Sequence, residues 1–251
     1  MALKLTSLAV QVKMLCYNAC NMRLNKFIAD SGYCSRRKAD ALIEEGRVLI
    51  NNRGAKLGDQ VNNTDSVIID DTPIINEGKE DIYIAFHKPA GVICSFDPKL
   101  HNTLADWVDV GERIFHVGRL DVASSGLLLL TNNGAIAEAI THPRGEHEKE
   151  YVVTLDKKFT RSFIDQMRDG VVILGSKTKP ARVKKLSDKK FSIVLTEGRN
   201  RQIRRMCEKL GYEVKKLRRT RVINVELGSL GEGNWRELTK KERRGLLEAV
   251  K

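Results

Sequence analysis

The run Leu127–Leu130, four consecutive leucines followed by Asn132, Asn133 and Gly134, constrains most strongly how this 251-residue chain can fold. An apolar run of this length that ends in a turn signal predicts a short buried strand and a tight turn. We therefore expect this segment in the interior of a domain.

One acid, Asp121, lies on the approach to this strand, between Gly118 and Gly126. The two glycines let the backbone bend sharply or let another molecule approach closely. A bent loop beside a buried strand is a common way to fix a reactive group on a rigid support. The same residues also describe a surface turn in which Asp121 caps a neighbouring backbone N–H, and by themselves they favour this second interpretation.

The charge balance points to a polyanionic partner. Lysine and arginine number 44 against 32 acids, which gives a net charge of +12, and this suits a nucleic acid above all. No apolar run approaches the roughly 18 residues of a membrane span, so we expect a soluble protein. The five cysteines and five histidines lack disulfide or metal-ligand spacing. The sequence therefore predicts no metal site and a reducing cytoplasm as the location.

The chain divides into an extension, a small module, a linker and a larger domain. Residues 1–21 contain no acid and lack the pattern of a secretory signal. We expect them to be a disordered tail or an upstream-start extension, with Met22 as the natural start. Residues 71–80 combine proline, glycine and acids, which predicts a surface linker.

Residues 22–70 predict a module of two helices and short strands. Apolar residues at helical spacing over 24–28 and the N-cap Ser35 predict the helices, and Val48–Ile50 and Val67–Ile69 predict strands. The helices, the turn and the hairpin of this module all carry basic side chains. Basic side chains often form only a solvated face, but one sign of charge shared by all these elements favours phosphate contact. The basic residues are Arg23, Lys26, Arg36, Arg37, Lys38, Arg47, Arg53 and Lys56.

This module resembles the S4 RNA-binding domain. The likeness is carried by Arg23-Leu-Asn-Lys-Phe-Ile, Ser31-Gly, Cys34-Ser-Arg-Arg-Lys-Ala-Asp, Gly46-Arg-Val-Leu-Ile-Asn and Gly58-Asp. The resemblance implies an RNA-facing helix over Ser35–Glu45, led by Arg36 and Arg37. Further RNA contacts are expected from Arg23, Lys26 and Arg53. S4 domains occur in unrelated RNA-binding proteins, so this likeness names a ligand class and no reaction.

Residues 81–251 predict an α+β domain with a mostly antiparallel sheet, because strand patterns outnumber interspersed helices. A capping box, Thr239–Glu242, opens the last helix. The other expected helices are 135–140, 160–167 and 201–210. The expected strands are 82–86, 127–130, 150–155, 171–174, 181–186 and 191–196.

The segment Arg199–Arg221 carries ten cationic residues and only two acids. A polyanion or buried acids must balance such a charge. Arg204 follows the core position Ile203 and is expected at the edge of an apolar helix face. A buried unpaired charge is costly, so an inward arginine needs an acid, and Asp121 is the candidate.

Five motifs occur in an order that points to one family. They are Lys88-Pro-x-Gly91, Gly118-Arg-Leu-Asp-x-x-Ser-x-Gly-Leu127, Lys149-Glu-Tyr-x-Val153, Gly198-Arg-Asn-Arg-Gln-Ile-Arg-Arg-Met206 and Lys216-Leu-Arg-Arg-Thr220. Together they resemble bacterial pseudouridine synthases of the ribosomal small-subunit-synthase-A type, in which an S4 domain precedes the catalytic domain. The segment 172–185 further resembles members that act on large-subunit rRNA. Ala123 departs from the pattern, since the family often has an acid there, and we expect altered hydrogen bonding at that position.

The resemblance implies a role for each site residue. Asp121 would be the catalytic aspartate, Tyr151 the residue that stacks on the target base, and Arg204 the ion-pair partner of Asp121. Leu217 would contact the uracil ring. Exchanging the C1′–N1 bond for C1′–C5 involves no redox change, so no metal or organic cofactor is expected. Phosphate contacts are expected from Arg119, Arg199, Arg201 and Arg218.

Several alternatives stay open. Asp121 is able to attack C1′, attack the ring, or abstract a proton. We expect a cytoplasmic monomer acting on a stem-loop of 23S rRNA, with 16S rRNA or tRNA as alternatives. The rival function is a non-catalytic S4-type RNA-binding or ribosome-assembly protein that kept the fold. A glycosidase is disfavoured, because hydrolysis normally uses a carboxylate pair and no second acid is evident near Asp121.

Overall fold

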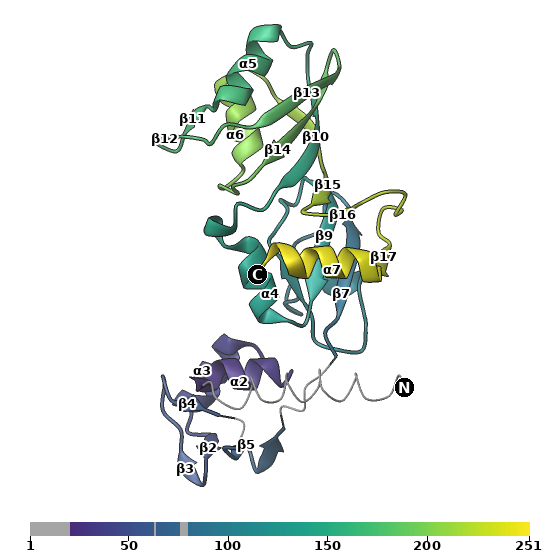
Figure 1. Cartoon of the computed structure of the whole chain (residues 1–251). Helices are drawn as coiled ribbons and strands as arrows, with labels where there is room; N and C mark the ends of the chain where they lie inside the picture. The colour runs from purple at the N-terminus through teal and green to yellow at the C-terminus, as the bar shows by residue number, and fades with distance from the viewer. Residues whose placement is uncertain (1–20, 63, 76–79) are drawn as a thin grey trace, which may run out of the picture. The chain divides into compact units, whose positions relative to one another are not determined.

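The computed structural model describes residues 21–62, 64–75 and 80–251 (Figure 1). Contacts divide the chain into one unit that ends at Glu80 and a second unit that spans Asp81–Lys251. The expectation of an extension over 1–21 falls, except for Asn21, outside the described residues.

The first unit, which we call the S4 unit, packs two helices on a small sheet. Ser35 caps the second helix, since its side chain accepts a hydrogen bond from the backbone N–H of Lys38 at 3.2 Å. Phe27 and Leu42, one from each helix, are buried in a core that includes Val48. The strands form a sheet of order β3-β2-β5-β6 and a separate pair β1-β4. The elements are β1 (Met22–Arg23), α2 (Leu24–Asp30), α3 (Arg36–Glu44), β2 (Val48–Ile50), β3 (Arg53–Gly54), β4 (Gln60–Val61), β5 (Val67–Ile69) and β6 (Thr72–Ile74).

Residues 72–74, which we expected in the linker, belong to the S4 unit, and the predicted start of the linker at residue 71 is wrong. They form β6, which pairs antiparallel with β5. Asp70 and Asp71 both have positive φ, 47° and 63°, which is the backbone of a tight two-residue hairpin turn. Pro73 is tolerated because β6 lies at the edge of the sheet. The proline and the two acids thus mark a hairpin.

The second unit, Asp81–Lys251, is built on a nine-stranded sheet of order β13-β14-β10-β15-β9-β7-β17, with β16 and β8 paired at its side. Among the described residues, the strands of this unit pair antiparallel except β9 with β15. The prediction of an α+β domain with a mostly antiparallel sheet is confirmed. The strands are β7 (Tyr83–Lys88), β8 (Phe115–Val117), β9 (Ser125–Thr131), β10 (Lys149–Leu155), β13 (Arg182–Ser187), β14 (Lys190–Leu195), β15 (Val214–Val222), β16 (Val225–Glu226) and β17 (Trp235–Glu237).

Helices lie beside two parts of this sheet (Figure 1): α5 and α6 near β10, β13 and β14, and α4 and α7 near β7 and β9. A short hairpin of β11 and β12 stands apart from the sheet. The predicted capping box is present, because Thr239 and Glu242 bond each other's backbone at the start of α7. The elements are α4 (Gly134–Thr141), α5 (Arg161–Asp169), α6 (Gln202–Lys209), α7 (Lys240–Ala249), β11 (Val172–Ile173) and β12 (Ser176–Lys177), with short 3-10 helices at Leu104–Asp106 and Pro143–Gly145.

The four leucines form the centre of β9, as the sequence predicts, and none is more than 2% exposed. Leu127 and Leu129 pack into one hydrophobic cluster, and Leu128 and Leu130 pack into another. The strand is therefore buried on both faces. Full burial of each leucine side chain stabilises the folded state by about 1.5–3 kcal/mol. The strand β9 is therefore a rigid support for the loop that precedes it.

The strand β15, which lies in the middle of the sheet beside β9, was not predicted from the sequence. β15 pairs antiparallel with β10 over most of its length and parallel with β9 at Arg218 and Arg219. Five of its nine residues are lysine or arginine. Its buried positions nevertheless include Val214, Leu217 and Arg219. β15 thus joins β9, which follows the Asp121 loop, to β10, which carries Tyr151.

Candidate active site

A pocket of about 290 Å³ lies where the loop before β9, the strands β10 and β15, and the start of α6 meet. It gathers side chains from four distant parts of the sequence. Its lining includes Gly118, Arg119, Leu120, Asp121, Ser124, Lys149, Tyr151, Glu197, Arg199, Arg201, Gln202, Ile203, Leu217 and Arg219.

The loop that carries Asp121 is held by backbone bonds to the segment after β7. Gly91 donates its N–H to the carbonyl of Val122 at 2.7 Å. The thiol of Cys94 donates to the carbonyl of Leu120 at 3.3 Å and lies 3.4 Å from the Leu120 nitrogen. These contacts fix both residues adjacent to Asp121 in the chain and so limit where its carboxylate can point.

That segment is in turn fixed by Lys88, which is fully buried at the end of β7. Its ammonium donates to the carbonyls of Pro89 and Val92, at 2.7 and 2.8 Å. The sequence by itself indicated only a turn at Lys88-Pro89. The structure makes this lysine a support for the turn whose Gly91 binds the Asp121 loop.

Asp121 is one-third exposed, and its carboxylate faces two guanidinium groups. Oδ2 lies 3.7 Å from Nε of Arg204 and 3.8 Å from Nη1 of Arg201. The turn is closed by the backbone, where the N–H of Ser124 donates to the carbonyl of Asp121 at 3.0 Å. The capping role considered for the Asp121 side chain is thus taken by the main chain, and the carboxylate is turned to the arginines and the pocket.

Arg204, on α6, holds the loop as well as facing its acid. Its guanidinium donates to the carbonyls of Ala123 and Val214, at 3.0 and 3.1 Å, and to the hydroxyl of Ser124 at 3.3 Å. Burial lowers the pKa of Arg204, and the charge of Arg201 adds to this effect, whereas Asp121 opposes it. The bond to residue 123 uses a backbone carbonyl, so alanine at that position keeps it.

Arg201 reaches the same carboxylate through an unusual backbone. It has a φ of 50°, left-handed for a residue with a side chain, at the residue before α6 begins. Its side chain is half exposed. Strained residues of this kind cluster at ligand sites, where the surroundings hold them in place.

Tyr151 and Leu217 stand on neighbouring strands and both line the pocket. Tyr151 of β10 is paired with Arg219 of β15, and Val153 is paired with Leu217. Side chains two residues apart on a strand share a face, so Tyr151, Leu217 and Arg219 lie on one side of the sheet. An aromatic ring and an apolar side chain beside an acid form a surface suited to a flat base.

Two cations in the pocket were given no role by the sequence: the half-buried Lys149 and the buried Arg219. Lys149 donates to the carbonyl of His147 at 2.9 Å, and burial together with the charge of Arg219 lowers its pKa to about 8. Arg219 is only 3% exposed. Arg219 lies two residues after Leu217 and therefore shares its face of β15. This spacing becomes informative only once residues 214–222 are known to form a strand.

The four arginines expected at phosphates differ in their surroundings. Arg119 and Arg201 line the pocket with exposed side chains. Arg218 lies on the opposite face of β15 from Leu217 and Arg219, as its exposure in the alternating pattern indicates. Arg199 differs from the other three, because its guanidinium bonds Glu197, Ser176 and Lys177 and so holds the β11–β12 hairpin.

In the S4 unit the expected RNA contacts also divide. Lys26 lies 3.5 Å from Asp30, and Arg53 lies 2.9 Å from Asp59, so both have an acid partner within the unit. Arg36 and Arg37 begin α3 with exposed side chains, and Arg23 is exposed in β1. Within the described residues of this unit, Arg23 and the start of α3 therefore present exposed positive charge.

None of the helices in the described part of the chain combines the length and apolar composition that a membrane crossing requires. Within the same residues, no group of three or more histidine, cysteine, aspartate or glutamate side chains is arranged to hold a metal ion.

Comparison with known proteins agrees with the fold and the pocket, which together define an RNA-acting enzyme. The family model described as RNA pseudouridylate synthase matches residues 82–209, and the S4 domain model matches residues 22–67. The chain belongs to the RNA pseudouridylate synthase family and carries an S4 domain. It is thus a pseudouridine synthase, an isomerase, and RNA is its substrate.

Individual relatives support the same assignment. The chain is 46% identical to the dual-specificity RNA pseudouridine synthase RluF of Escherichia coli K12, over 92% of this chain and 80% of that protein. It is 39% identical to the ribosomal large subunit pseudouridine synthase B of Bacillus subtilis, over 88% and 93% of the two chains. A crystal structure of a pseudouridylate synthase superposes with a TM-score of 0.67 at 33% identity, over 90% and 99%.

Proposed function

We propose that the protein converts one specific uridine of large-subunit rRNA to pseudouridine, with Asp121 as the reacting carboxylate. The observation that carries this proposal is the position of Asp121, in a pocket between two arginines and beside Tyr151. The rRNA target is supported by the name of the Bacillus subtilis relative. The dual specificity named for the Escherichia coli relative makes a second RNA, such as tRNA, a further candidate substrate.

In the proposed reaction the target uridine leaves its stack, and Tyr151 replaces the lost stacking on one face of the base. Leu217 contacts the ring from the neighbouring strand. Asp121 then acts on C1′, on the ring or on a sugar proton. The C1′–N1 bond breaks, C1′ bonds to C5, the hydrogen of C5 is released as a proton, and N1 takes up a proton.

Exposed arginines would hold the distorted strand at its phosphates. Arg119 and Arg201 are at the pocket, and Arg36 and Arg37 lie in the S4 unit. Because the isomerisation involves no redox change, we propose that the enzyme needs neither a metal nor an organic cofactor. We further propose that it works as a monomer in the cytoplasm, without a membrane partner.

Tritium release from rRNA labelled with [5-³H]uridine tests this proposal, because each isomerisation frees one C5 hydrogen. Wild type should release tritium from 23S rRNA that lacks the modification, and Asp121→Asn should release none above background. Asp165→Asn, an exposed acid of α5 paired with Arg168, is the matched control and should keep the wild-type rate. No release by wild type from 23S rRNA, 16S rRNA or tRNA would contradict the proposal.

Mapping the product identifies the substrate. The labelled RNAs are treated separately, and pseudouridine is located by chemical modification and primer extension. A single modified position in 23S rRNA is the expected result. Modification confined to 16S rRNA or tRNA would overturn the assigned substrate and leave the chemistry intact.

A further inference from the structure

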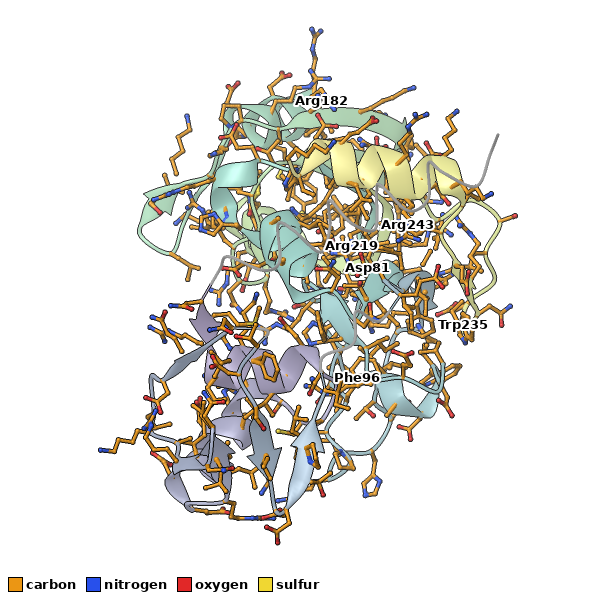
Figure 2. All side chains as sticks on the ribbon, turned by 60° about the horizontal axis from the view of Figure 1, so that its bottom comes forward. Asp81, Phe96, Arg182, Arg219, Trp235 and Arg243 are labelled. Atoms are coloured by element: carbon orange, nitrogen blue, oxygen red, sulfur yellow. The ribbon has the colours of Figure 1, made fainter. Side chains whose placement is uncertain are left out.

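Arg219 is a buried cation with an unused donor. Its Nε donates to the carbonyl of Leu127 at 2.7 Å, whereas its Nη2 is buried and has no hydrogen-bond partner in the described residues. In Figure 2 Arg219 lies towards the middle of the view of the second unit, whereas Arg182 lies near its upper edge. A buried unsatisfied donor is costly, which suggests that a ligand supplies the missing acceptor.

The acids around the pocket are already paired with other groups. Glu197 bonds Gln202 and Arg199. Glu148 and Glu150 bond Arg221 on the same strand as Arg219. These carboxylates are therefore committed and do not neutralise Arg219.

Lys149 adds a second cation to the same face of the sheet. It stands two residues before Tyr151 on β10 and lines the pocket with Arg219. The charge of Arg219 is one of the causes that lower the pKa of Lys149, which shows that the two cations are close enough to repel. The pocket thus holds two neighbouring cations, one half-buried and one buried, on the face that carries Tyr151.

The strand register places this charge next to the base platform. Arg219 is the cross-strand partner of Tyr151, and both side chains line the pocket. A flipped nucleotide enters a pocket with its base deepest, and its phosphates stay near solvent. The exposed Arg119 and Arg201 suit those phosphates, whereas the buried Arg219 lines the pocket beside Tyr151, on the side that the base would occupy.

We propose that Arg219 is a further catalytic residue, whose Nη2 donates to a carbonyl oxygen of the flipped uracil and whose charge stabilises the ring when it becomes anionic. The inference rests on the proposed function. When the C1′–N1 bond breaks, its electron pair goes to N1 and is shared with O2 and O4. When Asp121 instead attacks the ring, the C5=C6 pair moves towards O4. Each of these routes places negative charge on the carbonyl oxygens, where a fixed cation lowers the barrier.

Single-turnover kinetics on a stem-loop RNA around the mapped uridine test this role. Arg219→Gln should lower the rate constant by roughly 10²–10³-fold, as expected for a lost preorganised donor, with an unchanged dissociation constant for the RNA. Lys215→Gln removes one charge from an exposed position of the same strand and should change neither quantity. The proposal would be overturned if the Arg219→Gln enzyme kept the wild-type rate, whether or not its affinity for the RNA fell.

A second arm uses the wild-type enzyme, so it does not depend on the folding of a variant. Sulfur is a poorer acceptor than oxygen, so 2-thiouridine or 4-thiouridine at the target should slow the wild type. A methylphosphonate at the target phosphate should weaken binding without this loss of rate. Wild-type rates that are insensitive to both thio substitutions would overturn the proposal.

The inference and the proposed function fail in different ways. If wild type releases no tritium, the proposed function fails. If wild type is active, Asp121→Asn is inactive, and either the Arg219→Gln or the thio-uridine result is negative, only the role of Arg219 fails.

Discussion

The S4 unit and the active site both carry arginines, but those at the start of α3 in the S4 unit are exposed, whereas Arg204 and Arg219 of the active site are largely buried. In the S4 unit, Arg36 and Arg37 are exposed at the start of α3. At the active site, Arg204, which faces Asp121, is 14% exposed and Arg219 is 3% exposed, and both are fixed by bonds to backbone carbonyls.

This difference in exposure predicts that the two sets of arginines act on different quantities, the RNA affinity and the rate of isomerisation. Exposed cations act through solvent, are screened by salt, and attract any RNA backbone. Buried cations in a preorganised site are screened little and need no reorganisation during the reaction. We therefore expect changes in the S4 unit to alter binding and its salt dependence, and changes in the pocket to alter the rate of isomerisation.

The largest effect among the supporting residues is expected at Arg204. Arg204→Met removes the charge that faces Asp121 and three hydrogen bonds to the adjoining segments. The single-turnover rate should fall by roughly 10²–10³-fold, with RNA affinity retained. Arg205→Met is the control, because the guanidinium of this neighbouring arginine bonds Asn200 and does not face Asp121. If Arg205→Met lost as much rate as Arg204→Met, the total charge of α6 and not the position of Arg204 would determine the rate.

The next largest effect concerns the junction between β9 and β15. A Cβ on Gly126, which has a φ of 112°, would lie 2.2 Å from the backbone oxygen of Arg219. Gly126→Ala should lower the free energy of unfolding by about 3 kcal/mol through steric overlap and backbone strain. Gly175→Ala, at a φ of 78° with open space around it, should cost only about 1–2 kcal/mol. Equal losses in denaturant titrations of the two variants would contradict the close approach of the strands.

A smaller effect is expected from the S4 unit. Arg36→Gln combined with Arg37→Gln should weaken RNA binding roughly tenfold and lower the slope of log affinity against log salt by about 2. The control is Arg47→Gln, because Arg47 is paired with Glu45 and Asp70 and is not free to contact phosphates. A salt slope that changes as much in the control would mean that internal pairing does not decide which cations meet the RNA.

A separate effect, on stability alone, is a pH dependence at Lys149. Its folded-state pKa is lowered to about 8 by burial and by Arg219, so between about pH 8 and about pH 10.5 the unfolded chain binds more protons than the folded protein. Stability should therefore rise with pH across this window, relative to Lys149→Met. Denaturant unfolding of both proteins from pH 7 to 10.5 measures the difference. A difference that stays constant with pH would contradict the burial of a charged lysine.

The sequence predicted those parts of the fold whose patterns are local. The leucine run of β9, the cap at Ser35 and the capping box of α7 each depend on neighbouring residues, and each is present. Residues 72–74 were misassigned, because a proline between acids describes an edge hairpin as well as a linker.

The site could be predicted only where residues matched the family's motifs. Asp121, Arg204, Tyr151 and Leu217 do come together at one pocket. Arg219 was not predicted, because β15 is rich in cations and its alternation is visible only once its partners β10 and β9 are known. The commitment of Arg199 to the β11–β12 hairpin likewise depends on contacts between residues distant in sequence.

The division between affinity and chemistry is tested most directly by measuring rate and binding for two variants side by side. The stem-loop RNA is titrated to saturation in single-turnover reactions with Asp121→Asn and with the Arg36→Gln, Arg37→Gln double variant. Asp121→Asn should lose roughly 10⁴-fold or more in rate with unchanged affinity. The double variant should lose affinity and reach the wild-type rate at saturation. An Asp121→Asn enzyme that isomerises uridine at the wild-type rate would contradict the account.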